Sequence, residues 1–220
     1  MLIKPDKTSN FYRMKPEKYN KLLHNNVTTT YRKIDNEVVT GIERKSKSIA
    51  ENLELDDRIE TTAKKEPFIT LKDHKQNFDS NPKCRLINPT KTEIGKVSKQ
   101  ILDRINKRVA KANNTNLWRS TREVLLWFNA IDNKEKCKFI SFDVVDYYPS
   151  VTEKVLNKSL DFASEFDPIT TDERDIILHA KRSFLYSEES AWGKRETQNL
   201  FDVTMGSWDG AGGQLSFISY

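Results

Sequence analysis

The chain has 220 residues, of which 37 are Lys or Arg and 32 are Asp or Glu, so its formal net charge is +5. Charged residues make up 31% and no apolar run is long enough to span a bilayer, which excludes a protein built from membrane-spanning helices. Aromatic residues make up 10%, which excludes a wholly disordered chain. The basic balance is compatible with a nucleic-acid partner, although many proteins without one carry as much charge.

The cysteines and the first residues of the chain bear on the compartment in which the protein is expected. Cys84 and Cys137 lie far apart, and no Cys/His cluster with metal-ligand spacing accompanies them, so the sequence predicts no zinc site. The opening stretch MLIKPDKTSN lacks the apolar core of a secretory signal. We therefore expect a soluble intracellular protein with no membrane partner. The sequence does not distinguish the nucleus from the cytoplasm, and it predicts no oligomeric state.

Residues 1–65 are rich in lysine, and their apolar residues recur at helical spacing. Tyr19, Leu22 and Leu23 fall on one stripe, and a second stripe runs through residues 38–53. This pattern predicts an N-terminal extension of about two or three helices with basic outer faces. Those faces either are simply solvated or contact nucleic acid.

After residue 65 the pattern changes to short apolar runs bounded by turn residues. FITL at 68–71 and CRLI at 84–87, with the turn-rich stretch NFDSNP between them, predict a basic β-hairpin. Helical spacing returns at 94–109 and at 121–131, where Ser120 or Thr121 is the expected N-cap. Further on, the sequence predicts a buried strand at 138–145, a helix capped by Thr152 and a helix over 171–186.

The stretch FISFDVVDYYPSVT, residues 139–152, places Asp143 inside the predicted buried strand. A buried carboxylate is costly unless it is paired or binds a cation. Because Mg²⁺ prefers oxygen ligands, Asp143 and the carbonyl of Val144 would form half of a magnesium site where the strand opens into a cleft. The alternative is that Asp143 caps the next turn or pairs with a lysine. Asp146 follows at the spacing DxxD, which excludes the DxD pattern of a haloacid-type phosphatase.

The order of these segments resembles a reverse transcriptase. FITLKDHKQNFDSNPKCRLINP is similar to the first fingers motifs, FISFDVVDYYPSVTEKVL to motif A of the palm, and FDVTMGSWDGA to the start of motif B. The hairpin and the residues around Asp143 are most similar to those of Penelope-like and related eukaryotic mobile elements. The resemblance covers residues 66–211. It implies an α+β fold with right-hand polymerase fingers at 66–135, a truncated palm at 136–220 and a helical N-terminal extension at 1–65.

The resemblance also implies roles for single residues in motif A. Asp143 would be the catalytic, metal-binding aspartate, holding Mg²⁺ or Mn²⁺ with the carbonyl of Val144 beside it. Tyr148 would be the aromatic steric gate that excludes a ribose 2′-hydroxyl and so favours deoxynucleotides. The alternative for Tyr148 is an ordinary core or surface aromatic.

The remaining implied roles concern the incoming nucleotide. Arg85, assisted by Lys72 or Lys75, would bind its triphosphate, because arginine forms bidentate contacts with phosphate. The turn of motif B would lie beside the nascent base pair, and it consists of Met205, Gly206 and Ser207. The alternatives are an exposed hairpin arginine and an ordinary glycine turn.

The sequence departs from the family pattern after Gly206. Motif C, Tyr-x-Asp-Asp, should follow motif B, but no Asp-Asp pair occurs after Asp143, and the thumb is missing too. We therefore expect a reverse-transcriptase fragment that is inert alone, since two-metal phosphoryl transfer needs the second carboxylate. The alternative is a non-catalytic module that binds an RNA template or an RNA/DNA duplex through its phosphates. A third possibility is an unrelated basic α/β protein.

Overall fold

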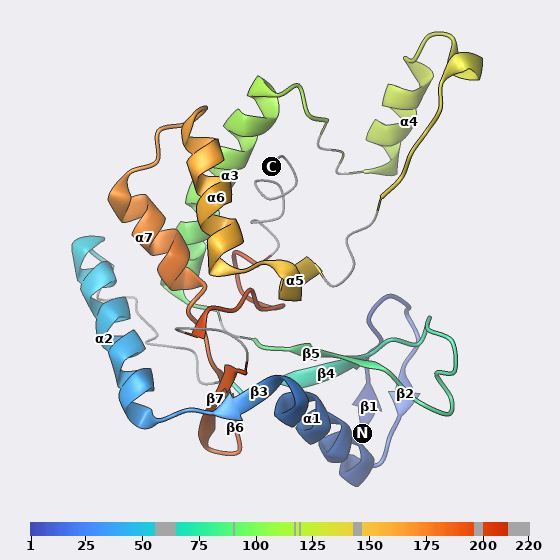
Figure 1. Cartoon of the computed structure of the whole chain (residues 1–220). Coiled ribbons are helices and arrows are strands. Elements are labelled where there is room, and N and C mark those ends of the chain that lie inside the picture. Colours follow the sequence, from blue (N-terminus) through green and yellow to red (C-terminus); the bar gives the residue numbers. More distant parts are fainter. Residues whose placement is uncertain are drawn as a thin grey trace.

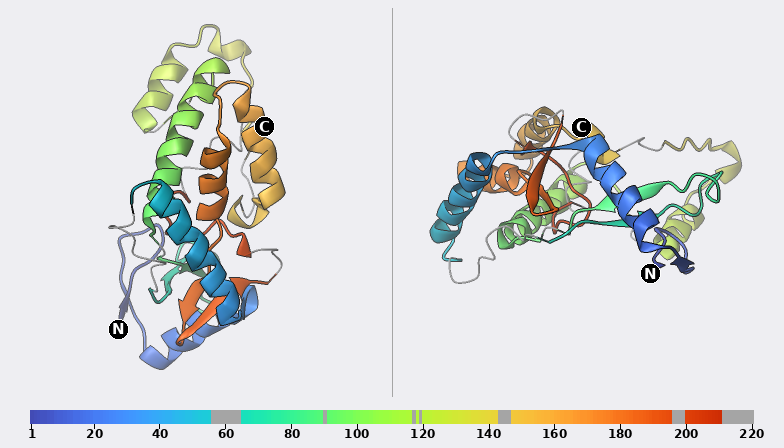
Figure 2. Two further views of the ribbon diagram at one scale, coloured as in Figure 1. Left: turned by 90° about the vertical axis from the view of Figure 1, so that its left-hand side faces the viewer. Right: turned by 90° about the horizontal axis from the view of Figure 1, so that it is seen from below.

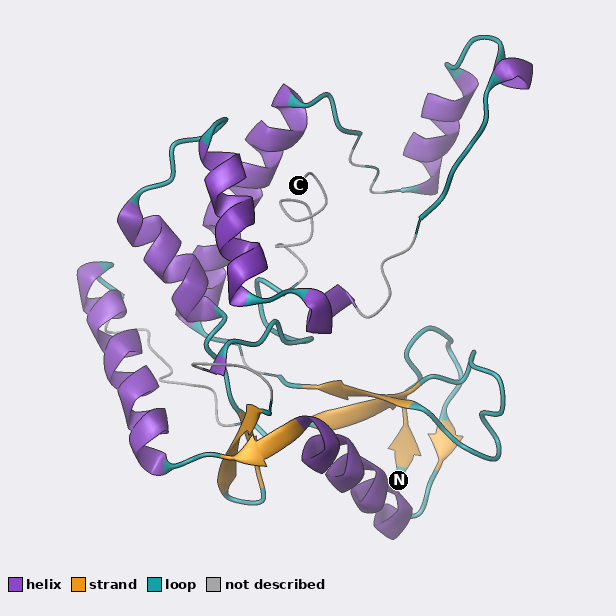
Figure 3. Ribbon diagram, in the orientation of Figure 1, coloured by secondary structure: helices purple, strands orange, loops and turns teal. Residues whose placement is uncertain are grey.

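The computed structural model describes residues 1–55, 65–89, 91–116, 118, 120–142, 147–195 and 200–210. Helices and strands are both present in it, which confirms the predicted α+β class (Figures 1 and 3). The helices are α1 (Pro16–Thr30), α2 (Asn36–Asn52), α3 (Glu93–Ala112), α4 (Thr121–Asn129), α5 (Tyr147–Ser150), α6 (Glu153–Ser164) and α7 (Thr171–Ala180). The strands are β1 (Leu2–Ile3), β2 (Tyr12–Arg13), β3 (Tyr31–Lys33), β4 (Phe68–Leu71), β5 (Cys84–Ile87), β6 (Leu185–Ser187) and β7 (Ser190–Lys194).

The predicted hairpin is present as the antiparallel pair β4–β5. Its register places Thr70 opposite Arg85 and Leu71 opposite Cys84. The chain N-terminus, which forms the small β1–β2 sheet, extends this hairpin, because Pro5 makes a parallel bridge with Leu71. The N-terminal residues are therefore in direct contact with the hairpin, and the boundary at residue 65 stays a prediction.

A second sheet, in the order β3–β7–β6, joins residues far apart in sequence. Its β6–β7 hairpin shows that the predicted helix over 171–186 is wrong at its end, since α7 stops at Ala180 and Leu185 begins β6. The hairpin turns through Glu188 and Glu189, whose φ angles are 52° and 56°. Such a turn usually carries Asn or Gly, so the Glu-Glu pair in the sequence did not indicate a hairpin turn.

Helices α3, α6 and α7 pack side by side as one layer next to the strands (Figures 1 and 2). Helix α3 confirms the helical pattern predicted at 94–109, and the Oγ1 of its N-cap Thr92 accepts a hydrogen bond from the Gly95 N–H at 3.0 Å. The predicted caps Ser120 and Thr152 are also present, on α4 and α6. The main core lies within this layer, and its buried members are Leu102, Ile105, Val109, Val151, Leu156, Leu160, Ala163, Ile177, Phe201 and Val203.

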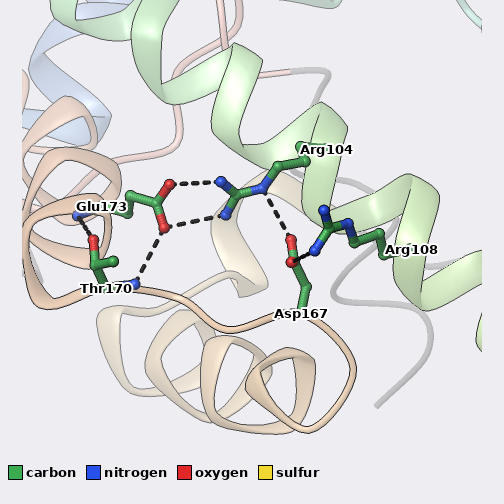
Figure 4. Close-up of polar contacts among 5 residues, drawn as sticks. All are labelled: Arg104, Arg108, Asp167, Thr170 and Glu173. Atoms are coloured by element: carbon green, nitrogen blue, oxygen red, sulfur yellow. Dashed lines mark hydrogen bonds and ion pairs between the residues drawn. The ribbon is translucent and has the colours of Figure 1, made fainter.

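An ionic network joins α3 to the start of α7 (Figure 4). Arg104 donates to Asp167 at 2.9 Å and forms a forked pair with Glu173 at 2.7 and 3.1 Å, and Arg108 also donates to Asp167. Glu173 and Thr170 complete a capping box at the helix start. The Arg104 guanidinium, which donates to Glu173, holds the pKa of that carboxyl below its usual value. This network connects α3 with the start of α7.

The predicted buried strand at 138–145 is wrong over its described part. Residues 138–142 form no strand, and the side chains of Phe139, Ile140 and Phe142 are 58%, 77% and 90% exposed. A β-rich sequence becomes a strand only when a neighbour pairs with its backbone, and none of the described strands does so here. The segment instead follows α4, which lies apart from the helical layer (Figure 1). Among the described residues, no helix combines the length and the apolar character needed to cross a membrane.

Candidate functional site

A pocket of about 670 Å³ lies between the β4–β5 hairpin and the rest of the molecule. Its walls come from the hairpin, the end of α1, β3, helix α5, β7 and the segment 202–205. Its size falls in the range of small-molecule sites, which span roughly 300 to 1,000 Å³. The fold thus brings Lys7, the middle of the chain and residues 202–205 to one concave surface.

The described walls of this pocket carry mostly positive charge. The cationic side chains that line it are Lys7, Lys72, Lys75, Arg85 and Lys194. Cations gathered in a concave site concentrate their field and attract anions. The pocket is therefore suited to phosphate groups, and we call it the basic pocket.

Asp202 is the acidic side chain among the described residues of the pocket wall. Its carboxylate accepts a hydrogen bond from the Tyr31 hydroxyl at 2.9 Å and contacts the Lys194 ammonium at 3.1 Å. Burial, together with the Asp202 charge, raises the pKa of Tyr31, so this hydroxyl stays a donor. Asp202 thus belongs to a satisfied buried network and offsets mainly the charge of Lys194.

Arg85 is half-buried in the pocket wall and is paired with a carboxylate from the N-terminus. Its Nη1 lies 2.6 Å from Oδ1 of Asp6. Within the described part of the chain, Lys72 and Lys75 have no ion-pair partner, and Lys75 is exposed. The hairpin cations therefore differ, because the arginine is held in place and the lysines are open to an incoming anion.

The loop that carries Lys72 and Lys75 is anchored through Asp73. The Asp73 carboxylate accepts hydrogen bonds from the hydroxyl of Thr8 and, at 3.0 Å, from that of Tyr12. The hydrogen bond from Thr8 holds the pKa of Asp73 below its usual value, and its side chain is only 2% exposed. The N-terminal segment therefore fixes the start of the hairpin loop beside the basic pocket.

Tyr147 and Tyr148 close the pocket on the side of the helical layer. Their rings pack edge to face with centroids 5.6 Å apart, and both also contact the main core. Burial raises the pKa of Tyr147 to about 12. Tyr148 is therefore both a packing residue and part of the pocket wall, and its role as a steric gate stays a prediction.

The segment 205–207 forms a turn, as its sequence suggests. Gly206 has φ +114°, a conformation that L side chains rarely adopt. Met205 lines the basic pocket, whereas Ser207 faces a separate cavity of about 40 Å³ and donates to the carbonyl of Thr204 at 3.2 Å. The structure therefore gathers Lys72, Lys75, Arg85, Tyr148 and Met205 around one pocket, with Gly206 in the turn behind it and Ser207 elsewhere.

The expected metal ligands Asp143 and Val144 lie outside the described residues. Among the residues that are described, no group of three or more His, Cys, Asp or Glu side chains could hold a metal ion. The predicted site for Mg²⁺ or Mn²⁺ therefore stays a prediction.

Sequence reasoning missed several residues of the pocket. Lys7 enters it because the N-terminus joins β4, Lys194 because β3 pairs with β7, and Asp202 because its N–H is bonded to the carbonyl of Lys181. Asp6 and Asp73 were also missed as the partners that hold the hairpin. No local motif marks these residues, since their placement depends on pairing between segments that are distant in sequence.

No protein-family model, no curated protein and no solved structure matches the chain. The reverse-transcriptase resemblance therefore depends on the sequence motifs alone.

Proposed function

We propose that the chain is a reverse-transcriptase relative that binds nucleotides and nucleic acid, with the β4–β5 hairpin as fingers and the helical layer as part of a palm. One observation carries this proposal. Residues that the motifs assign to nucleotide binding come from separate segments and line one basic pocket, and they are Lys72, Lys75, Arg85, Tyr148 and Met205. Lys72, Lys75 and Arg85 come from one hairpin, whereas Tyr148 and Met205 come from segments that are distant from it in sequence.

The chemistry of the pocket suits a deoxynucleoside triphosphate. Arg85, Lys72 and Lys75 would receive its phosphates, because charge-assisted hydrogen bonds to phosphate are strong in a concave site. On the opposite wall, the Tyr148 ring would lie against the sugar and exclude a 2′-hydroxyl. Met205, beside the glycine turn, would lie near the base.

We do not propose DNA synthesis by these 220 residues alone. Their sequence contains Asp143, the aspartate that the motifs assign to the metal, and has no Tyr-x-Asp-Asp motif after it. Two-metal catalysis needs carboxylates that hold both ions. Because Asp143 and Val144 lie outside the described residues, no chemical step is assigned to a metal here.

Nucleotide binding can be tested by calorimetry with dATP. The Arg85→Ala variant should bind at least about tenfold more weakly, because it loses a charge-assisted phosphate contact. The Lys107→Ala variant is the matched control, since Lys107 is an exposed lysine on α3 outside the pocket wall. Tyr148→Ala should narrow the difference in affinity between dATP and ATP. Equal affinities of the Arg85→Ala and Lys107→Ala variants would contradict the proposal.

The tip of the hairpin favours a second candidate function, non-catalytic binding of nucleic acid. His74, Lys75, Asn77 and Lys83 surround an open polar hollow there, next to the basic pocket. If the chain binds an RNA/DNA duplex through this tip, affinity should fall steeply with salt. Lys83→Ala should then weaken duplex binding while dATP binding stays unchanged, because Lys83 does not line the basic pocket.

A further inference from the structure

Asp6 holds the Arg85 guanidinium from outside the basic pocket. The two side chains meet at 2.6 Å, and the Asp6 side chain is only 9% exposed. Arg85 is part of the pocket wall, whereas Asp6 is not. The carboxylate therefore lies behind the arginine rather than in the path of a ligand.

The backbone fixes Asp6 in this position. Its N–H donates to the carbonyl of Leu71 at 2.8 Å, and the N–H of Leu71 is directed at the carbonyl of Lys4 at 3.4 Å. These bonds accompany an isolated parallel bridge between Pro5 and Leu71 of β4, and Arg85 of β5 lies opposite Thr70 of β4. Because its own N–H is bonded to the carbonyl of Leu71, Asp6 cannot withdraw without breaking that backbone hydrogen bond.

Asp6 is bonded to only part of the Arg85 guanidinium. A guanidinium carries N–H donors on Nε, Nη1 and Nη2, and Asp6 is bonded through Nη1 alone. Nε of Arg85 and Oδ2 of Asp6 are both buried without a hydrogen-bond partner, so the pair is not bidentate. A long side chain normally loses rotamer freedom when it binds a ligand. Because Asp6 already restricts the rotamers of Arg85, less conformational entropy is lost when Arg85 binds an anion.

We propose that Asp6 is a positioning residue, which holds Arg85 in the orientation that receives the phosphates of a nucleotide. This inference rests on the proposed function of the basic pocket. It also extends that function, because it makes the N-terminal segment part of the phosphate site.

The direction in which Asp6→Ala changes the affinity for an anion distinguishes a positioning role from a purely electrostatic effect. Removing a carboxylate beside a cationic pocket strengthens anion binding when only charge matters. Removing a carboxylate that orients the anion-binding arginine instead weakens anion binding. We therefore expect Asp6→Ala to bind inorganic tripolyphosphate about fivefold more weakly, or worse, although the variant is more positively charged.

The experiment is calorimetry of the full chain with inorganic tripolyphosphate in EDTA. The variants are Asp6→Ala, Arg85→Ala and the double variant, with Asp6→Asn as a replacement of the same shape in case the alanine variant does not fold. Asp6→Asn should weaken binding in the same direction, and the double variant should match Arg85→Ala. Asp103→Ala is the control, because it removes an exposed carboxylate on α3 that lies outside the pocket wall.

The possible failures are distinguishable. If Arg85→Ala weakens binding but Asp6→Ala and Asp6→Asn leave it unchanged or tighter, the positioning role is wrong and the phosphate pocket stands. The same conclusion follows if Asp6→Ala weakens binding equally in the Arg85→Ala background, or if Asp103→Ala weakens binding as much as Asp6→Ala does. If Arg85→Ala has no effect, or the unmodified chain does not bind tripolyphosphate, the proposed function fails and the positioning role with it.

Discussion

The backbone N–H of Asn88 donates a hydrogen bond to the carbonyl oxygen of Met205 at 3.1 Å. This bond joins the end of β5 directly to the turn that carries Gly206. The side chain of Asn88 also donates to the carbonyl of Phe184 at 3.1 Å, so one buried residue connects three segments. The basic pocket depends on this connection, because Met205 lies in its wall.

Gly206→Ala should destabilise the protein by more than about 2 kcal/mol, since it combines backbone strain with a steric clash. A Cβ at Gly206 would collide with the carbonyl oxygen of Asn88, and φ +114° is strained for any L side chain. The measurement is the free energy of unfolding in urea. Gly41→Ala is the matched control, because nothing lies within 4 Å of a Cβ there and the residue is inside α2. That control should be neutral or stabilising.

Lys181 and Asp209 form a buried ion pair at 2.7 Å, with side chains 2% and 0% exposed. Asp209 also accepts a hydrogen bond from Ser98 at 2.8 Å. Asp209→Ala should cost about 3–5 kcal/mol of unfolding free energy, because it leaves an uncompensated buried ammonium. Asp103→Ala removes the exposed pair with Lys99 and should cost less than about 1 kcal/mol. Similar losses of unfolding free energy in both variants would contradict the claim that burial makes the Lys181–Asp209 pair more costly to break.

Asp167 should contribute measurably through its bonds to Arg104 and Arg108 (Figure 4). Its side chain is 1% exposed, and Asp167→Asn keeps the shape while removing the charge. We expect a loss of about 1–3 kcal/mol, which is typical of hydrogen bonds between charged groups. Asp172→Asn, at an exposed position on α7, is the control. Thermal melting of the two variants would show the difference in stability. Equal melting temperatures for Asp167→Asn and Asp172→Asn would mean that the network adds no stability.

The sequence predicted elements whose causes are local, and it failed where the cause is pairing. Apolar spacing and capping residues place α3 and α6 correctly, since a helix forms its hydrogen bonds within one segment. The segment 138–142 has the composition of a strand, but a strand needs a neighbour that composition does not supply. The pocket residues of the β4–β5 hairpin were predicted because they lie within one local motif. Asp6 and Lys194 were not predicted, because their positions depend on pairing between distant segments.

His179 should make stability depend on pH. Its Nε2 lies 2.8 Å from the Ser46 hydroxyl, between α7 and α2, and its ring is buried. Burial lowers its pKa from 6.5 to about 4, although the charge of Asp175 opposes this and those of Arg182 and Lys45 support it. The folded state therefore disfavours the imidazolium form.

Because the folded pKa is depressed, the unfolded chain binds the proton first. The contribution of His179 is complete above pH 6.5 and is lost as pH falls from there toward about 4. The difference between these pKa values corresponds to about 3 kcal/mol. Urea unfolding between pH 7 and pH 4.5 should show most of this loss, and His179→Gln should remove it, because Gln does not titrate. Parallel pH profiles of the two proteins would show that His179 does not control acid stability.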